Sequence, residues 1–247
     1  MIVRVFIVGA QRCGTTFLYR LLDSHPDVVM ARPVRPEPKI FLTDDVTGDS
    51  RAYDARLFAG VSATRVRGEK ATSYLEHPEA LDRIAATFPD AHIVVAVRDP
   101  IERALSNYRF SVDHGLEDRS PDAALLDDLE GRDRAWDRAR ISVSPYAYVR
   151  RGRYLEGIRR VEARFDRARI HVVVFEELVA DVREAAGVFR ALGVGAPPRG
   201  GMPTVAVNPS AAPGTLSATV RARLRDHYAE ANAALARHLG RPLDAWR

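Results

Sequence analysis

The sequence has a single cysteine, Cys13, and no cluster of cysteine and histidine at zinc-ligand spacing. An internal disulfide is therefore excluded, no metal is expected, and a reducing cytoplasm is the simplest location. No apolar run approaches the roughly 18 residues of a membrane span. The first run, residues 1–10, contains Arg4 and is unlike a signal peptide. We therefore expect a protein that neither spans a membrane nor is exported.

Lysine is also scarce, because only Lys39 and Lys70 occur among 37 basic residues. Arginine thus carries nearly all the positive charge, and its planar guanidinium suits bidentate binding of anionic oxygens. The formal net charge of +4 fits an anionic small ligand, and equally the composition of an arginine- and alanine-rich genome. We expect no nucleic-acid partner, and the oligomeric state cannot be read from the sequence.

Three short runs rich in β-branched residues predict strands at residues 3–9, 92–98 and 169–175. They are too apolar to alternate, which is typical of strands covered on both faces in a parallel sheet. Between them, apolar residues at helical spacing predict helices near 15–25, 77–88 and 99–112. Asp99 and Pro100 are a strong start signal for the third helix. The alternation predicts one doubly wound α/β domain over residues 1–247.

Other stretches are defined by composition. Residues 32–50 and 193–215 concentrate proline and glycine and are long for ordinary connections, which indicates functional loops. Residues 117–143 are highly charged, and we expect surface helices there. The chain closes with an amphipathic helix near 216–240, whose apolar stripe consists of Leu216, Val220, Leu224, Tyr228 and Ala231.

The segment "GAQRCGTT", residues 9–16, has the G-x-x-x-x-G frame of a nucleotide-phosphate loop. Thr15 stands where that motif has the lysine that reaches the β- and γ-phosphates. Backbone N–H groups and the following helix can still hold one phosphate, and Arg12 can supply a cation from within the loop. The alternative is a strand-to-helix turn without a ligand.

Two motifs resemble those of sulfotransferases that use 3′-phosphoadenosine 5′-phosphosulfate (PAPS), especially the carbohydrate and bacterial branch. "VGAQRCGTTFLYRLLDSHPDV" is similar to the 5′-phosphosulfate loop of that family, with Arg12 in place of the usual lysine. "RDPIERALSNYRFSV" resembles the 3′-phosphate element, an arginine at a strand end and a serine eight residues later, here Arg98 and Ser106. The family implies a P-loop-like, three-layer α/β/α fold with a mainly parallel sheet.

Weaker fragments follow in the same order. "RPEPKIFL" at 35–42 resembles Lys-Glu-Pro-x-Phe-Phe, and "GEKATSYL" at 68–75 resembles Gly-Glu-x-Ser/Thr-Pro-x-Tyr at a strand end. "FEELVAD" and the final "HLGRPLDAW" also have counterparts, so the resemblance extends over essentially the whole chain. Lys70 is expected to face the cleft, and Tyr74 to line the acceptor pocket.

The resemblance implies PAPS as sulfuryl donor, without a metal, and a carbohydrate or small-molecule acceptor. Arg12 would stabilise the leaving phosphate, while Glu37 would be the general base, with His114 as its rival because its unperturbed pKa is suitable. The residues expected to bind the donor are Gln11, Arg12, Cys13, Gly14, Thr15, Thr16, Arg98, Ser106, Arg153, Tyr154, Asn208 and Ser210.

Two alternatives stay open. An ATP-dependent small-molecule kinase would use the same fold, although Thr15 replaces its lysine. A non-catalytic nucleotide-binding module would keep the phosphate loop without turnover. Acceptor pockets are built from variable loops, so the acceptor itself has no readable signature.

Overall fold

The computed structural model describes residues 2–61, 64–195 and 214–246. The chain divides into two compact units, which are considered one at a time. Unit 1 comprises Met1–Val97 and Ile158–Val207, and unit 2 comprises Arg98–Gly157 and Asn208–Arg247. The expected single domain stays a prediction.

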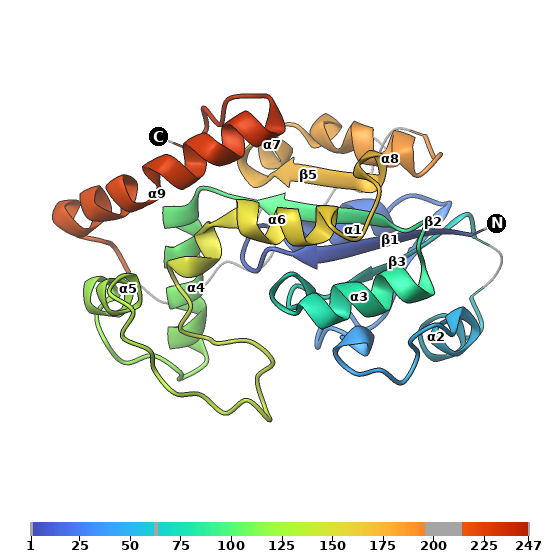
Figure 1. The fold of residues 1–247 in the computed structure, drawn as a ribbon, viewed down its shortest axis with the longest axis horizontal. Coiled ribbons are helices and arrows are strands. Elements are labelled where there is room, and N and C mark those ends of the chain that lie inside the picture. Colours follow the sequence, from blue (N-terminus) through green and yellow to red (C-terminus); the bar gives the residue numbers. More distant parts are fainter. Residues whose placement is uncertain (1, 62–63, 196–213, 247) are drawn as a thin grey trace. The chain divides into compact units, whose positions relative to one another are not determined.

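Unit 1 is built on a five-stranded parallel sheet, in the order β2-β3-β1-β4-β5 (Figure 1). The apolar runs correctly predicted β1, β4 and β5, whereas β2 and β3 are additional. Because all strands run the same way, their carboxyl ends meet at one edge of the sheet. The strands are β1 (Val3–Gly9), β2 (Val28–Met30), β3 (Val66–Lys70), β4 (His92–Val97) and β5 (Ile170–Val174).

The two faces of the sheet are covered by different helices. Val5 and Ile7 point into a cluster with α1 (Thr15–Asp23), α7 (Phe175–Ala180) and α8 (Ala186–Ala191). Phe6, between them in β1, points to the opposite face. Its ring packs there against rings from the 3₁₀ helix η1 (Ile40–Leu42), α2 (Ser50–Leu57) and the end of α3 (Pro78–Thr87), namely Phe41, Tyr53 and Phe88. The predicted three-layer α/β/α fold is confirmed.

Unit 2 is built around α4 (Pro100–Asp113), which begins as the sequence predicts. The Asp99 side chain accepts from the N–H groups of Ile101 and Glu102, at 2.8 and 3.0 Å, with Pro100 in the first turn. The closing helix α9 (Ala218–Leu239) buries Val220, Leu224 and Tyr228 against α4 and its neighbours. The remaining helices are α5 (Pro121–Leu129) and α6 (Tyr154–Glu162), the latter crossing the unit boundary.

The expectation of helices throughout 117–143 is wrong beyond α5. That helix ends at Leu129, with Glu130 as its C-cap residue, because Gly131 adopts a left-handed conformation, with φ at 72°. The N–H of Gly131 bonds to the carbonyl of Asp128, and that of Arg132 to Asp127, which closes the last turn. Residues 132–143 then continue without a helix.

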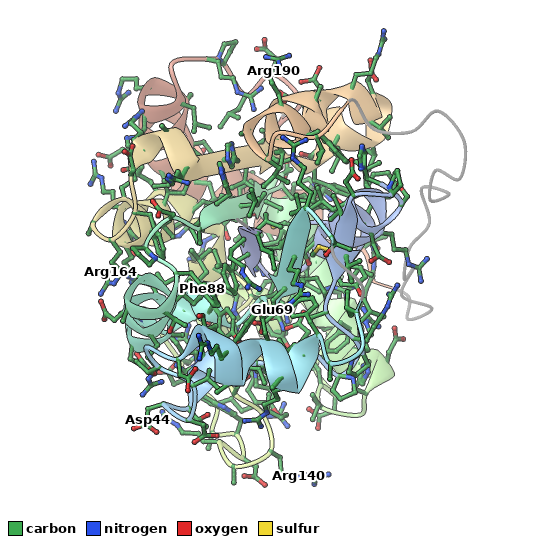
Figure 2. The ribbon with its side chains drawn as sticks, turned by 90° about the vertical axis from the view of Figure 1, so that its right-hand side faces the viewer. Asp44, Glu69, Phe88, Arg140, Arg164 and Arg190 are labelled. Atoms are coloured by element: carbon green, nitrogen blue, oxygen red, sulfur yellow. The ribbon has the colours of Figure 1, made fainter. Side chains whose placement is uncertain are left out.

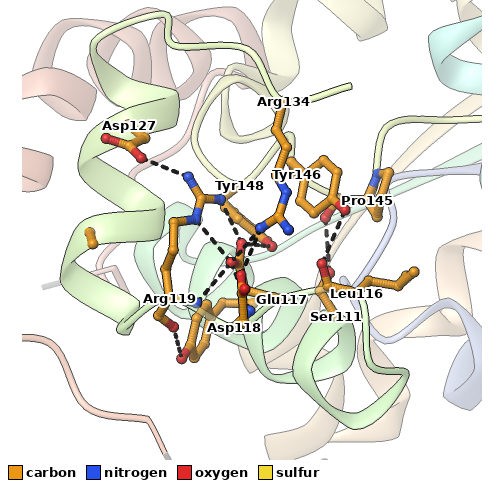
Figure 3. Close-up of polar contacts among 12 residues, drawn as sticks. Ser111, Leu116, Glu117, Asp118, Arg119, Asp127, Arg134, Pro145, Tyr146 and Tyr148 are labelled. Atoms are coloured by element: carbon orange, nitrogen blue, oxygen red, sulfur yellow. Dashed lines mark hydrogen bonds and ion pairs between the residues drawn. The ribbon is translucent and has the colours of Figure 1, made fainter. Parts of the chain in front are cut away.

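A buried carboxylate organises this irregular part of unit 2 (Figure 3). Glu117 accepts from Arg119 Nη2 at 2.6 Å, Tyr148 Oη at 2.8 Å and Arg134 Nη1 at 3.1 Å. Although burial alone raises it, these bonds and the Arg119 charge lower the pKa of Glu117 to about 2. The many arginines near residues 117–134 are thus largely committed to internal ion pairs.

Two histidines pair on the sheet of unit 1. His92 Nδ1 lies 3.1 Å from His171 Nε2, with the rings stacked at 5.4 Å. Burial, with the His92 charge, lowers the pKa of His171 from 6.5 to about 4, and burial lowers that of His92. The unfolded chain therefore binds more protons than the folded one between about pH 6.5 and 4.

We expect this pair to make the protein less stable in acid. Above pH 6.5 both histidines are neutral in the folded and the unfolded chain, so the free energy of unfolding does not depend on them. It should fall by about 1–2 kcal/mol as the pH drops to 4, allowing for partial exposure. Urea unfolding at several pH values measures it. In His171→Gln the free energy of unfolding should depend less on pH between 6.5 and 4. An unchanged dependence would show that other groups cause the loss of stability.

No helix among residues 2–61, 64–195 and 214–246 is long and apolar enough to cross a membrane.

Candidate functional site

The candidate site lies at the carboxyl edge of the unit 1 sheet, where parallel α/β sheets bind ligands. The loop of residues 10–14 follows β1 and leads into α1. Glu37 lies in the segment after β2, and Lys70 ends β3. β1 pairs with both β3 and β4, so its end is the point at which the strand order reverses.

Gly14 is required at the start of α1 for two reasons. It adopts a left-handed conformation, with φ at 75°, as the N-cap residue of the helix. A Cβ atom there would also lie 2.2 Å from Cδ2 and 2.5 Å from Cε2 of Phe175, the first residue after β5. The Phe175 ring thus packs directly on the loop backbone.

Gly14→Ala should destabilise the protein by about 2–4 kcal/mol, through the positive φ and the overlap with Phe175. Chemical denaturation measures the change. Gly187→Ala in α8 is the matched control, since nothing lies within 4 Å of its Cβ position, and it should be neutral or slightly stabilising. Equal effects of both variants would contradict this packing.

The remaining loop residues are arranged around an open helix N-terminus. Arg12 also has a positive φ, 69°, and Cys13 is buried with its Sγ 3.8 Å from the Gln11 carbonyl. Thr15 and Thr16 begin α1 and are buried. Gly14, the N-cap residue, has no side chain that could cap the helix, and the first turn has no acidic residue. Its N–H groups and positive dipole end are therefore suited to an anion.

Gln11 adds an unsatisfied acceptor beside this loop. Its Oε1 is buried and has no hydrogen-bond partner among residues 2–61, 64–195 and 214–246. Buried polar atoms in proteins are nearly always paired, so an orphan at a candidate site fits a group supplied by a ligand.

Glu37 binds two residues at the end of β3. Its Oε1 accepts from Lys70 Nζ at 2.7 Å, and its Oε2 accepts from the Thr72 N–H at 2.9 Å. Thr72 Oγ1 lies 3.2 and 3.1 Å from the two carboxylate oxygens. The segment between β2 and η1 is thereby fastened to β3.

This ion pair is buried and next to the phosphate-type loop. Lys70 is only 3 % exposed; burial lowers its pKa, and the Glu37 charge opposes that shift. The N–H of Ala71 bonds to the Ile7 carbonyl of β1 at 3.1 Å. A Cβ at Gly9, where the loop begins, would lie 3.4 Å from the Thr72 carbonyl. The carboxylate, the ammonium group and the loop thus share one edge of unit 1.

A second carboxylate of β3, Glu69, was not foreseen as a functional candidate. It is fully buried on the opposite sheet face, in the layer that also holds Phe88 (Figure 2). Tyr74 Oη donates to it at 2.6 Å and Tyr53 Oη at 2.9 Å. Burial raises the pKa of Glu69 to about 7, against the effect of these bonds.

The same tyrosine anchors the segment that carries Glu37. Tyr74 Oη accepts from the N–H of Phe41 at 3.0 Å, and Arg83 Nη1 donates to the carbonyls of Phe41 and Leu42, both at 3.0 Å. Tyr74 is fully buried, so it does not line an acceptor pocket as the sequence suggested. Through its bond to the Phe41 N–H, it holds the segment that follows Glu37.

The other predicted residues belong to unit 2. Arg98 directly follows β4, and Ser106 lies two turns into α4. Tyr154 is buried and its hydroxyl donates to the Arg98 carbonyl at 2.7 Å, so it fixes the backbone of Arg98. Arg153 is exposed and pairs with Glu156 at 3.0 Å.

His114 is the C-cap residue of α4. Its Nδ1 lies 2.8 Å from the Phe110 carbonyl, and its exposed ring contacts the Phe110 ring. The structure thus gives His114 a helix-capping contact, while its catalytic role stays a prediction.

Two predicted donor-binding residues, Asn208 and Ser210, lie outside the described residues. Within the part of the chain that the structure describes, no three His, Cys, Asp or Glu side chains are grouped to hold a metal ion.

The comparisons with known proteins agree on one family. A family model described as "Sulfotransferase family" matches residues 4–74 and 58–198. A crystal structure of a sulfotransferase from Alicyclobacillus acidocaldarius superposes with a TM-score of 0.76 at 26% identity, covering 100% of this chain and 99% of that one.

Two curated relatives are much longer proteins, of which this chain matches only a part. Mouse heparan sulfate glucosamine 3-O-sulfotransferase 3B1 is 29% identical over 178 residues, which are 72% of this chain and 42% of that protein. The membrane-associated sulfotransferase kil1 of Dictyostelium discoideum is 28% identical over 116 residues, 47% of this chain and 24% of that protein. The chain thus spans less than half the length of these relatives.

Proposed function

Since the chain belongs to the sulfotransferase family, we propose that it transfers a sulfuryl group from PAPS to an acceptor hydroxyl. The acceptor would be a carbohydrate, a glycosylated metabolite or another small molecule. The observation that carries the proposal is the Glu37 carboxylate bound to Lys70 beside the loop of residues 9–16. The carbohydrate class is supported by the mouse relative, whose name specifies the glucosamine of heparan sulfate.

In this reaction the acceptor oxygen attacks sulfur while the bond between sulfur and the 5′-phosphate oxygen breaks. The acceptor proton passes to Glu37, and the bond electrons remain on the phosphate of 3′,5′-adenosine diphosphate. Arg12 and the N–H groups at the start of α1 stabilise that growing charge. As in phosphoryl transfer, positioning and electrostatics supply most of the catalysis.

Glu37 retains the capacity to accept a proton. A carboxylate has about four acceptor sites. Lys70 Nζ and the Thr72 N–H occupy two, and the single Thr72 hydroxyl hydrogen is shared between the oxygens. Among residues 2–61, 64–195 and 214–246, these contacts leave one acceptor site of Glu37 for the acceptor hydroxyl.

The remaining donor contacts are proposed by residue type. Thr15, Thr16 and the loop from Gln11 to Gly14 would hold the 5′-phosphate. Arg98 and Ser106 would bind the 3′-phosphate, as a guanidinium and a hydroxyl suit a phosphate dianion. Arg153, Asn208 and Ser210 would contact the nucleotide, with Tyr154 acting through the Arg98 carbonyl. The cytoplasmic location and the independence from metal remain part of the proposal.

A thermal-shift comparison separates this function from an ATP-dependent kinase. At about 100 times Kd, a ligand that binds only the folded state adds about 2.7 kcal/mol of stability. We expect 3′,5′-adenosine diphosphate to raise Tm in the presence of EDTA, and ATP with Mg²⁺ to have little effect. The reverse pattern would favour the kinase. Sulfated product from the unmodified protein would exclude a non-catalytic module.

A further inference from the structure

Thr72 makes an unusual double contact with one carboxylate. Both its backbone N–H and its hydroxyl bond to Glu37, and it is only 8 % exposed. Lys70 ends β3, the N–H of Ala71 still bonds to the Ile7 carbonyl of β1, and Thr72 lies in the turn that follows. Two residues at this strand end thus bind both oxygens of Glu37.

We propose that Thr72 is a positioning residue, which fixes the orientation of the Glu37 carboxylate. This inference rests on the proposed function, in which Glu37 takes the acceptor proton. A lysine contact alone leaves a carboxylate free to rotate about its last bond, whereas a second donor on the other oxygen fixes its plane. With both oxygens held, the unused acceptor site points in one direction.

This arrangement depends on the residue type at position 72. The family pattern Gly-Glu-x-Ser/Thr-Pro-x-Tyr places proline there, and proline has neither an N–H nor a hydroxyl. The paired donors are therefore a feature of this chain. The other groups around the ion pair are Arg35 and Lys39, whose charges act on Lys70, and Glu69, on which the Glu37 charge acts.

Four variants separate the two donors of Thr72. Thr72→Val removes the hydroxyl at nearly constant shape, Thr72→Ser retains it, Thr72→Ala removes it with some volume, and Thr72→Pro removes both donors. We expect kcat to fall about tenfold in Thr72→Val and Thr72→Ala and about 100-fold in Thr72→Pro, with KM for PAPS nearly unchanged. The Thr72→Ser variant should keep at least a third of the activity. A purely structural role would instead lower the active fraction and leave kcat per active molecule unchanged.

The contact between Thr72 and Glu37 can also be tested by a measurement that does not depend on catalysis. In protein labelled with ¹³C at glutamate carboxyl carbons, the Glu37 signal is assigned by its loss in Glu37→Gln. The chemical shift of this carbon, read at one fixed pH, responds to the hydrogen bonds of the carboxylate, so it should change in Thr72→Val and Thr72→Ala and stay in place in Thr72→Ser. If Val does not fold, Ala carries the same comparison.

The two possible failures are distinct. If the Glu37 signal does not change in Thr72→Val or Thr72→Ala, Thr72 does not hold the Glu37 carboxylate, and the inference is overturned whatever the activity. If the signal changes but the unmodified protein transfers no sulfuryl group to any acceptor, the proposed function fails while the contact stands.

Discussion

We expect Glu37→Gln to lower kcat for sulfuryl transfer about 10²- to 10⁴-fold, the usual contribution of a general base. Glutamine keeps the size of the side chain and a carbonyl that can accept from Lys70 or Thr72, but it cannot take up the acceptor proton. The expected loss is therefore in kcat, with little change in the affinity for 3′,5′-adenosine diphosphate. Initial rates and calorimetric titration of the two proteins measure these quantities.

Two comparisons make this prediction specific. Glu184→Gln replaces an exposed carboxylate of unit 1 with the same change of charge, and we expect no effect on kcat. His114→Gln tests the rival base. A large loss in His114→Gln together with an active Glu37→Gln protein would assign the proton transfer to the histidine.

Arg12→Ala should lower kcat/KM about 10²- to 10³-fold, comparable to the loss of one donor that stabilises developing charge. Arg12 is the only basic residue of the loop 9–16, and its charge would act on the leaving phosphate. The left-handed backbone at this position is no worse for alanine than for arginine, so the substitution should add no backbone strain. Steady-state kinetics and a denaturation curve test both statements.

Arg20→Ala is the matched control, because it removes an exposed arginine from the same helix region. It should retain activity. Arg12→Lys should recover part of the rate, since it restores the charge without the bidentate geometry. Full activity of Arg12→Ala would refute this role of the loop.

The sequence predicts the fold well where strands are apolar. β1, β4 and β5 are covered on both faces, so most of their residues are apolar and they stand out as runs. The phosphate-type loop was also predictable, because the positive φ and close packing at position 14 require a glycine, which is visible in the sequence. The start of α4 was predictable because Asp99 caps the helix and Pro100 is its first residue.

β3 was harder, because the sequence "VRGEK" carries charge inside the core. Glu69 and Lys70 are acceptable there only because Tyr53, Tyr74 and Glu37 satisfy them, and those partners come from distant segments. Periodicity cannot anticipate such pairing. The resemblance to a family strand end was the one signal that located this segment.

Incubation with PAPS labelled with ³⁵S and a panel of carbohydrate and small-molecule acceptors, including an extract of the source organism, tests the proposed transfer to a hydroxyl with Glu37 as the proton acceptor. We expect a labelled product formed one-to-one with 3′,5′-adenosine diphosphate, insensitive to EDTA and nearly lost in Glu37→Gln. Binding of 3′,5′-adenosine diphosphate without any labelled product, or equal product from Glu37→Gln, would contradict it.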